Sequence, residues 1–277
     1  MGFFSNLFGK KDKKRNYEGA SKGKRFGRWR TPRTDANAAA DTSLAGLRDR
    51  ARDLVRNNPY AARGKVSIAN NVIGKGIKTQ IRGTGRNIPE LQRLWDNWTK
   101  SRFFDHENRM GLFQMQHLAT QSLCESGEFL LRRIVDNSKK FPISYQLLEA
   151  DFIDMTTSNY RLPNGNFILQ GIEFDQNGRR VAYHLHDRHP GSIVTDPKKS
   201  FQSSRVPASE IHHVFRLDRP GQVRGVTWFS PVIIRLKDLD DFEDAQLVRQ
   251  KIAACFTAFV KDINGDVESD DEGDLGE

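Results

Sequence analysis

Apolar residues recur at helical spacing through much of the first half of the chain. Leu44, Leu47 and Leu54 predict a helix that begins at Thr42 or Ser43, and Asn57-Asn58-Pro59 ends it. The same periodicity predicts three further helices, over residues 60–73, 88–99 and 106–126. This part of the chain is therefore expected to be helical.

The period of the pattern changes near residue 127, where short runs rich in β-branched and aromatic residues begin. GEFLLRRIVD (127–136) and ISYQLLEADFID (143–154) are predicted to form an antiparallel pair. NFILQGIEFD (166–175) and RRVAYHLH (179–186) are predicted to form a second pair, because Asn177-Gly178 between them is a strong hairpin signal. SSRVPASEIHHVFRLD (203–218) is expected to supply a turn and one more strand.

A long helix is predicted at the end of this pattern, over residues 231–260. Its apolar side is expected to include Leu239, Phe242 and Leu247. Helices first, a meander of strands next and a helix last indicate an α+β fold. We divide the chain into a basic flexible arm (1–41), an α+β body (42–260) and an acidic disordered tail (261–277).

Charge is spread unevenly along the 277 residues, whose net charge is +9. Residues 1–35 hold eleven basic and three acidic residues, whereas residues 262–277 hold eight acidic residues and no basic one. This balance suits binding to a polyanion or to an acidic protein surface, and an arm that only keeps the chain soluble is an equally good interpretation. The arm residues concerned are Lys10, Lys11, Lys13, Lys14, Arg15, Arg25, Arg28 and Arg30.

Catalytic and metal-binding patterns are weak. His184, His186 and His189 have a spacing that invites a metal site, but histidines on a strand that face water are the better interpretation. Glu149, Asp151 and Asp154 are interpreted as residues that bound a strand and its turn. Nucleophile-elbow, zincin and Walker motifs are absent from the sequence, so we expect no catalytic residues, no bound metal and no cofactor. Cys124 and Cys255 are expected to be free thiols.

Seven segments, taken in order, resemble the lambda-type family of bacteriophage portal proteins. The likeness runs from about residue 44 to about residue 260, and the order of the segments makes it specific. The segments are LVRNNPYAARGKVSIANNVIGKGI, LWDNWTKSRFFD, GEFLLRR, QLLEADFID, GIEFDQNGRRVAYHLH, RVPASEIHHVFRLDRPGQVRGVTWFSPV and LKDLDDFEDAQLVRQKIAA.

This resemblance implies a structural subunit of a ring, usually a dodecamer, at one capsid vertex. Such a ring supports head assembly and passes double-stranded DNA during packaging and ejection. The partners it implies are further copies of the chain, the terminase large subunit, capsid, scaffold and neck proteins, and the DNA in the channel, with no membrane. The location it implies is the virion, and the bacterial cytoplasm during assembly. On this resemblance the chain corresponds to the wing-like portion, without the C-terminal clip and crown. A basic nucleic-acid-binding protein that forms no ring is the alternative.

The loop RLDRPGQVRGVTWFSP (216–231) offers candidate residues for contact with a neighbouring subunit or with DNA. Its planar guanidinium groups suit carboxylates or phosphates, and pairing within the same chain is nearly as good an interpretation. The acidic start of the following helix is a candidate partner from an adjacent subunit. The candidate residues are Arg216, Arg219, Gln222, Arg224, Asp238, Asp241 and Asp244.

Overall fold

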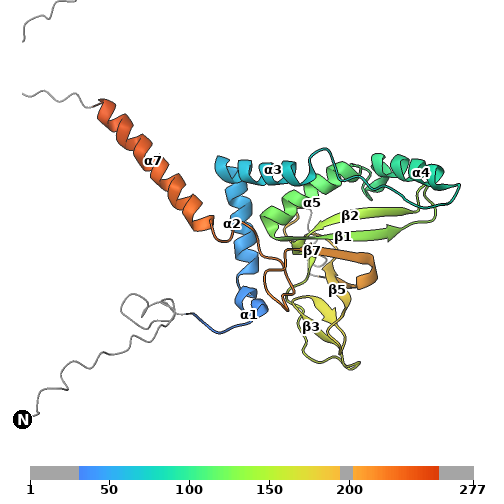
Figure 1. The fold of residues 1–277 in the computed structure, drawn as a ribbon. Helices are drawn as coiled ribbons and strands as arrows, with labels where there is room; N and C mark the ends of the chain where they lie inside the picture. Colours follow the sequence, from blue (N-terminus) through green and yellow to red (C-terminus); the bar gives the residue numbers. More distant parts are fainter. Residues whose placement is uncertain (1–30, 194–201, 256–277) are drawn as a thin grey trace, which may run out of the picture.

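The computed structural model describes residues 31–193 and 202–255. It shows a mixed body of helices and two antiparallel sheets, from which one long helix projects (Figure 1). The α+β prediction is confirmed. The helices are α1 (Ala36–Ala40), α2 (Leu44–Asn57), α3 (Pro59–Ile73), α4 (Ile88–Lys100), α5 (Leu112–Ser126) and α7 (Ile233–Cys255).

Asn58 makes the corner between α2 and α3. Its backbone N–H donates to the carbonyl of Leu54 at 2.7 Å and closes α2. Its side chain accepts a hydrogen bond from the N–H of Ala61 at 3.0 Å and caps α3, in which Pro59 occupies the first turn. One buried asparagine thus ends one helix and begins the next.

Helix α5 begins at Leu112 and not at His106 as predicted. Asp105 accepts a hydrogen bond from the N–H of Arg109, and Asn108 has a φ of 57°, so the chain turns before the helix. A side chain at Gly111 would meet the carbonyl oxygen of Thr99 at 2.9 Å, which explains the glycine there.

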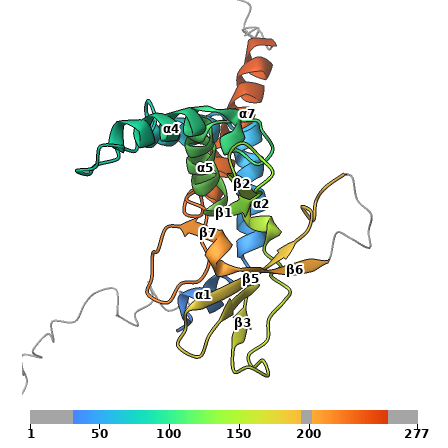
Figure 2. The same cartoon turned by 90° about the vertical axis from the view of Figure 1, so that its right-hand side faces the viewer.

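The strands form two sheets (Figure 2). One has the order β2-β1-β7 and the other the order β3-β4-β5-β6, and all pairs within them are antiparallel. The strands are β1 (Glu128–Val135), β2 (Ile143–Glu149), β3 (Phe167–Leu169), β4 (Ile172–Phe174), β5 (Arg180–His186), β6 (Ser203–Pro207) and β7 (Ile211–Phe215).

Both predicted pairings are confirmed. β1 pairs with β2 in register from Phe129 opposite Glu149 to Val135 opposite Ile143. β4 pairs with β5 across the Asn177-Gly178 turn, where Gly178 has a φ of 76°.

Two segments that were each predicted to supply one strand contain two. Residues 166–175 form β3 and β4, because Gln170 and Gly171 both have a positive φ, of 51° and 78°. Residues 203–218 form β6 in one sheet and β7 in the other, with a short 3-10 turn, Ala208–Glu210, between them. The chain therefore crosses from one sheet to the other at this turn.

Two apolar clusters hold the body together. The first lies between the sheets and includes Leu130, Ile172 and Tyr183. The second lies among the helices and includes Ala51, Leu54 and Phe229. Phe229 and Ile233 belong to the second cluster, so the first turn of α7 is anchored in the body. Among the described residues, no helix is both long enough and apolar enough to cross a bilayer.

Candidate subunit interface

The loop from residue 216 to 231 joins β7 to α7, and two of its arginines are exposed. Arg216 forms an ion pair with Asp218 at 2.6 Å and lies over the ring of Trp228, 5.2 Å from its centroid. The Nη2 atom of Arg219 donates to the carbonyl of Thr34 at 3.1 Å. Both guanidinium groups have partners in their own chain and still face solvent.

Arg224 corrects our expectation of a residue offered to a neighbour or to DNA. Its side chain is 1% exposed, and its Nη2 atom lies 2.6 Å from Oε1 of Glu128. Its other N–H groups donate to the carbonyls of Gln170 at 3.2 Å and Ala150 at 3.4 Å. The intrachain alternative therefore describes this arginine, because the folded body covers it.

Glu128 is the centre of this buried network. It also accepts a hydrogen bond from the N–H of Gly225 at 2.7 Å, and Nε2 of His213 lies 2.9 Å from its second oxygen. Burial alone would raise the pKa of Glu128, but the positive charge of Arg224 and the hydrogen bond with His213 hold it well below its usual range. Burial lowers the pKa of His213 despite this carboxylate. The loop is thus fixed to β1 by a charged pair with matched hydrogen bonds.

Gln222 likewise points inward and not toward a neighbour. Its Oε1 atom accepts from the N–H groups of Asp218 and Arg219, and its Nε2 atom donates to the carbonyl of Arg224 at 2.8 Å. A side chain with these partners has little to offer another molecule, which corrects the expectation for Gln222. Its role is to hold the loop in one shape.

The last part of the basic arm is structured. Asp35 caps α1, and Asn37 donates to the carbonyl of Gly221 at 2.9 Å and accepts from the N–H of Val223 at 2.8 Å. Residues 36–40 of the predicted arm, which extends to residue 41, thus form a short helix that is hydrogen-bonded to the loop. The eight basic arm residues, Lys10, Lys11, Lys13, Lys14, Arg15, Arg25, Arg28 and Arg30, lie outside the described residues, as does the acidic tail 261–277.

Helix α7 carries the three predicted acidic residues, Asp238, Asp241 and Asp244, and all three are exposed. Asp241 forms an ion pair with Lys237 at 2.6 Å within the helix. Their pairing with arginines of an adjacent subunit stays a prediction.

The apolar residues of α7 are the larger finding. We expected Leu239, Phe242 and Leu247 on a buried side, but Phe242 is 59% exposed and Leu247 is 54% exposed. The first three turns contact the body through Ile233, Leu236 and two hydrogen bonds from the start of α3. The exposed large apolar residues of the helix are Ile234, Leu239, Phe242, Leu247, Val248 and Ile252. This many exposed large apolar side chains on one helix indicate a site that another molecule covers.

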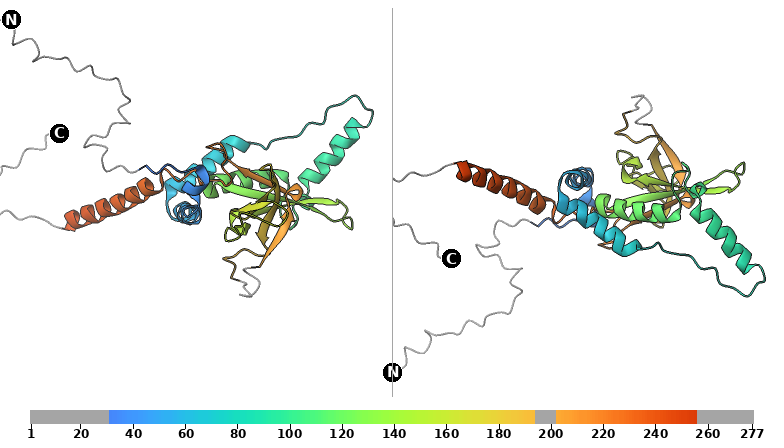
Figure 3. Two further views of the ribbon diagram at one scale, coloured as in Figure 1. Left: turned by 90° about the horizontal axis from the view of Figure 1, so that it is seen from below. Right: turned by 90° about the horizontal axis from the view of Figure 1, so that it is seen from above.

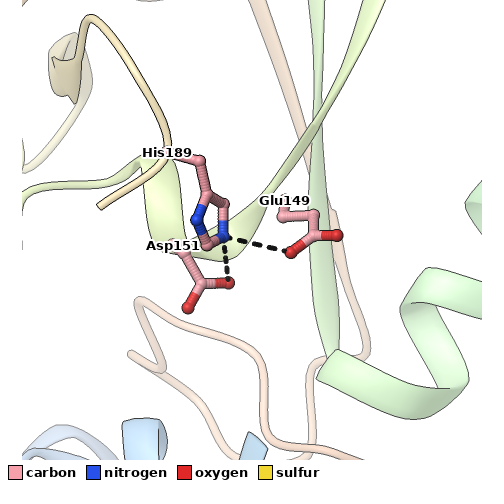
Figure 4. Close-up of side chains that lie close together, drawn as sticks. All are labelled: Glu149, Asp151 and His189. Carbon is pink, nitrogen blue, oxygen red and sulfur yellow. Dashed lines mark ion pairs between the residues drawn. The ribbon is translucent and has the colours of Figure 1, made fainter. Parts of the chain in front are cut away.

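A histidine and two carboxylates come together at the end of β2 (Figure 4). The Nε2 atom of His189 lies 3.4 Å from Glu149 and 4.0 Å from Asp151. Arg52 of α2 already lies between the carboxylates, with Nη2 at 2.7 Å from Glu149 and 2.6 Å from Asp151. Burial would raise the pKa of Asp151, but the hydrogen bond from Arg52 and the positive charges of Arg48 and Arg52 lower it below its usual value. The cluster is an ion-pair network that ties α2 to β2, and a cation there would meet the charge of Arg52.

The other two histidines do not face water as expected. The side chain of His184 is 17% exposed and lies 4.0 Å from Glu173, and that of His186 is 10% exposed and lies 3.9 Å from Asp154. Burial lowers the pKa of His184. Both therefore belong to the packing of the four-stranded sheet.

Asp154 organises the turn that follows β2. Burial would raise its pKa, but hydrogen bonds from Thr156, Thr157 and Ser203 lower it to about 2. This carboxylate is satisfied by hydroxyl groups and has a structural role. Asp154 belongs to the turn after β2, whereas Glu149 and Asp151 lie at the end of the strand. This agrees with the interpretation that these acids bound a strand and its turn.

Comparison with known proteins bears on what covers α7. A family model described as phage portal protein, lambda family, matches residues 22–276, so the likeness does not end near residue 260 as expected. A probable portal protein of Halomonas phage phiHAP-1 is 30% identical over 239 residues, which is 81% of this chain and 46% of that protein.

Two portal proteins of Escherichia phages are also similar. That of phage N15 is 23% identical over 255 residues, and portal protein B of phage lambda is 22% identical over 254 residues. Each match covers 84% of this chain and 46% of the relative, so the chain spans less than half the length of the curated relatives it matches. With the family model covering nearly all of the chain, this protein belongs to the lambda family of phage portal proteins.

Proposed function

We propose that the chain is a structural subunit of a portal ring at a capsid vertex, which supports head assembly and the passage of double-stranded DNA. Membership of the family supports this role. The observation that carries it is that most large apolar side chains of the 23-residue helix α7 are exposed to solvent.

The distribution of these residues argues for cover on more than one side. Ile234, Val248 and Ile252 lie near one line along the helix, whereas Phe242 and Leu247 lie on other sides. A helix that is apolar on several sides is normally buried among other helices. A closed ring supplies such cover, because each subunit then contacts one neighbour on either side.

The body supplies a rigid mount for this helix. Phe229 and Ile233 are buried, and Asn58 and Tyr60 hold Asp240 and Glu243 at 3.2 Å and 3.1 Å. The first turns of α7 therefore keep a fixed direction relative to the sheets. A fixed direction is what a repeated contact between identical subunits requires. The terminase, the capsid, scaffold and neck proteins and the DNA are its further proposed partners.

The experiment is a measurement of mass in solution together with negative-stain imaging. The wild-type chain is expected to form a large discrete oligomer with a central hole. Phe242→Ser combined with Leu247→Ser is expected to shift it to single subunits with an unchanged melting temperature, because both side chains are exposed in the subunit. Gln250→Ser on the same helix is the control, with the oligomer retained.

A chain that stays small at high protein concentration contradicts the ring. If that small species also binds DNA with a steep dependence on salt, the chain acts as a basic nucleic-acid-binding protein. The uneven charge of the sequence is the feature that favours this second candidate.

A further inference from the structure

Helix α4 and the end of the β1–β2 hairpin border an open groove of about 440 Å³. Helix α4 and the tip of this hairpin lie at the end of the described body opposite to α7 (Figures 1 and 3). Its apolar lining includes Ile81, Leu91, Leu94, Trp95, Phe141 and Ile143.

Part of this lining packs against the rest of the body, and part of it is exposed to solvent. Leu91, Leu94, Trp95 and Trp98 recur at helical spacing along α4, and Trp98 packs on Phe104 with ring centroids 5.0 Å apart. Leu91 and Leu94, two turns and one turn earlier, are 47% and 50% exposed. Across the groove Ile143 is 38% exposed. The apolar side of α4 therefore continues beyond the surface that its own body covers.

The wall of the groove is built in advance by hydrogen bonds. The side chain of Gln92 accepts from the N–H of Ile81 at 2.8 Å and donates to the carbonyl of Thr79 at 3.2 Å. Gln116 of α5 makes the same kind of pair with the backbone of Ile77, at 2.9 Å and 3.0 Å. These two glutamines hold the segment 77–81 beside α4, so a ligand would not have to order it.

The surroundings of the groove are basic. The segment 77–89, which leads into α4, contains three basic residues and no acidic one. Lys140 lines the groove itself. Five basic residues around it are exposed and have no ion pair with any described residue: Lys78, Arg82, Arg86, Arg93 and Lys140.

The acidic residues nearby offset little of this charge. Asp96 lies 3.9 Å from Lys100, and Asp136 lies 3.9 Å from Lys139. Glu90 on α4 is exposed. An occupant that carries carboxylates would therefore be attracted to this groove.

We propose that the α4 groove binds an acidic amphipathic helix of another protein. Apolar side chains at helical spacing on that helix would fill the groove beside Leu91 and Leu94, and its carboxylates would meet the surrounding lysines and arginines. Double-stranded DNA has phosphates for the basic residues but no apolar face, and would leave the groove uncovered.

The basic arm and helix α7 of this chain fit the groove less well. The basic arm has the same sign of charge as the groove's surroundings. Helix α7 has acidic and apolar residues, but in the proposed ring it is covered by neighbouring copies around the axis. That placement, with the α4 groove at the outer edge, rests on the proposed function, whereas the groove and its charge do not.

The experiment measures binding of a labelled helical peptide of about 20 residues to the full chain. The peptide carries leucine at helical spacing on one face and glutamate elsewhere, and the matched peptide carries lysine in place of glutamate. The glutamate peptide is expected to bind at least about tenfold more tightly at low salt, and the difference is expected to shrink at high salt.

Two variants test the two halves of the site separately. Leu94→Ser is expected to weaken the glutamate peptide about tenfold without changing the melting temperature, since Leu94 is half exposed. Arg82→Glu with Arg86→Glu is expected to reverse the preference toward the lysine peptide. Leu247→Ser on α7 is the matched control, with binding unchanged.

The proposal is overturned if neither peptide binds, if both bind equally, or if Leu94→Ser has no effect. It is also overturned if a DNA duplex binds with a steep salt dependence that the arginine variant reduces and Leu94→Ser does not, because the basic residues then form a phosphate-binding surface. Oligomer mass is measured on the same samples. If the chain forms no ring but still binds the glutamate peptide, the proposed function is contradicted and the proposal for the groove is not.

Discussion

The loop 216–231 and helix α7 follow one another in the sequence and have opposite characters. In the loop, Arg224 and Gln222 are buried and their hydrogen-bonding groups have partners in the same chain. In α7, only Ile233 is buried and large apolar side chains meet solvent. The loop is satisfied by contacts within the chain, whereas the apolar side chains of α7 lack such contacts and are suited to contact with another molecule.

The residue types alone suggest the reverse. Arginines in a glycine- and proline-containing loop are typical of a binding surface, and leucines at helical spacing are typical of a core. The structure places the central arginine in the core and most of the leucines outside it. Exposed apolar side chains, more than the charges of the loop, therefore indicate where another molecule would contact this chain.

The largest expected effect comes from breaking the buried pair. Arg224→Ala leaves the carboxylate of Glu128 buried without its partner, and we expect a loss of about 3–5 kcal/mol in the free energy of unfolding, measured with urea. Arg219→Ala removes one exposed hydrogen bond and is the matched control, with an expected loss below about 1 kcal/mol. Similar losses for the two variants would remove the distinction between a buried and an exposed arginine in this loop.

A smaller effect is expected from acid. The pKa of Asp154 in the folded chain is about 2, below its ordinary value of 3.8, so its stabilising contribution is complete above about pH 4 and is lost as the pH falls toward 2. Asp154→Asn is expected to cost about 2 kcal/mol near neutral pH. Urea unfolding from about pH 6 to about pH 3 checks this, because the variant is expected to lose less stability over that range. An identical slope for variant and wild type would contradict the role of this carboxylate.

A third variant tests whether α1 helps to hold the loop in its shape. Asn37→Ala removes two hydrogen bonds to the loop, and we expect a loss of about 1 kcal/mol and faster hydrogen exchange at the N–H of Val223. Asn71→Ala, on the exposed side of α3, is the control. Unchanged exchange at Val223 would mean that the loop keeps its shape without α1.

The reactivities of the two cysteines compare the body with α7 without any substitution. Burial raises the pKa of Cys124 to about 11, so its thiol is expected to resist alkylation near neutral pH. Cys255 at the end of α7 is exposed and is expected to react first. Intact mass during labelling checks this, and early modification at Cys124 would show that the helical cluster opens easily.

Local sequence patterns predicted the elements that depend on neighbouring residues. The corner at Asn58-Pro59 and the hairpin at Asn177-Gly178 follow from capping and turn chemistry, and both are present. The turn at Gln170-Gly171 was missed because glutamine rarely adopts a positive φ. Here the close approach of Gly171 to the carbonyl of Asp154 and a hydrogen bond from Gln170 to Asp41 hold the turn. Both partners are distant in the sequence, so the pattern did not reveal them.

The candidate interface could be predicted only in part for the same reason. The partner of Arg224 is Glu128, 96 positions away, and no local signal connects them. The exposure of Phe242 and Leu247 depends on how few body residues reach α7. Periodicity shows that a helix has an apolar side, but it does not show what, if anything, lies against that side.

The guanidinium of Arg224 also sets an order of events during folding. It bonds to the start of β1, to the carbonyl that follows β2 and to the turn between β3 and β4, so it has its full set of partners only once both sheets have formed. The loop that carries it leads directly into α7. A copy whose sheets have not formed therefore holds this loop by fewer hydrogen bonds, and we expect the start of α7 to be less firmly fixed in it than in the folded body.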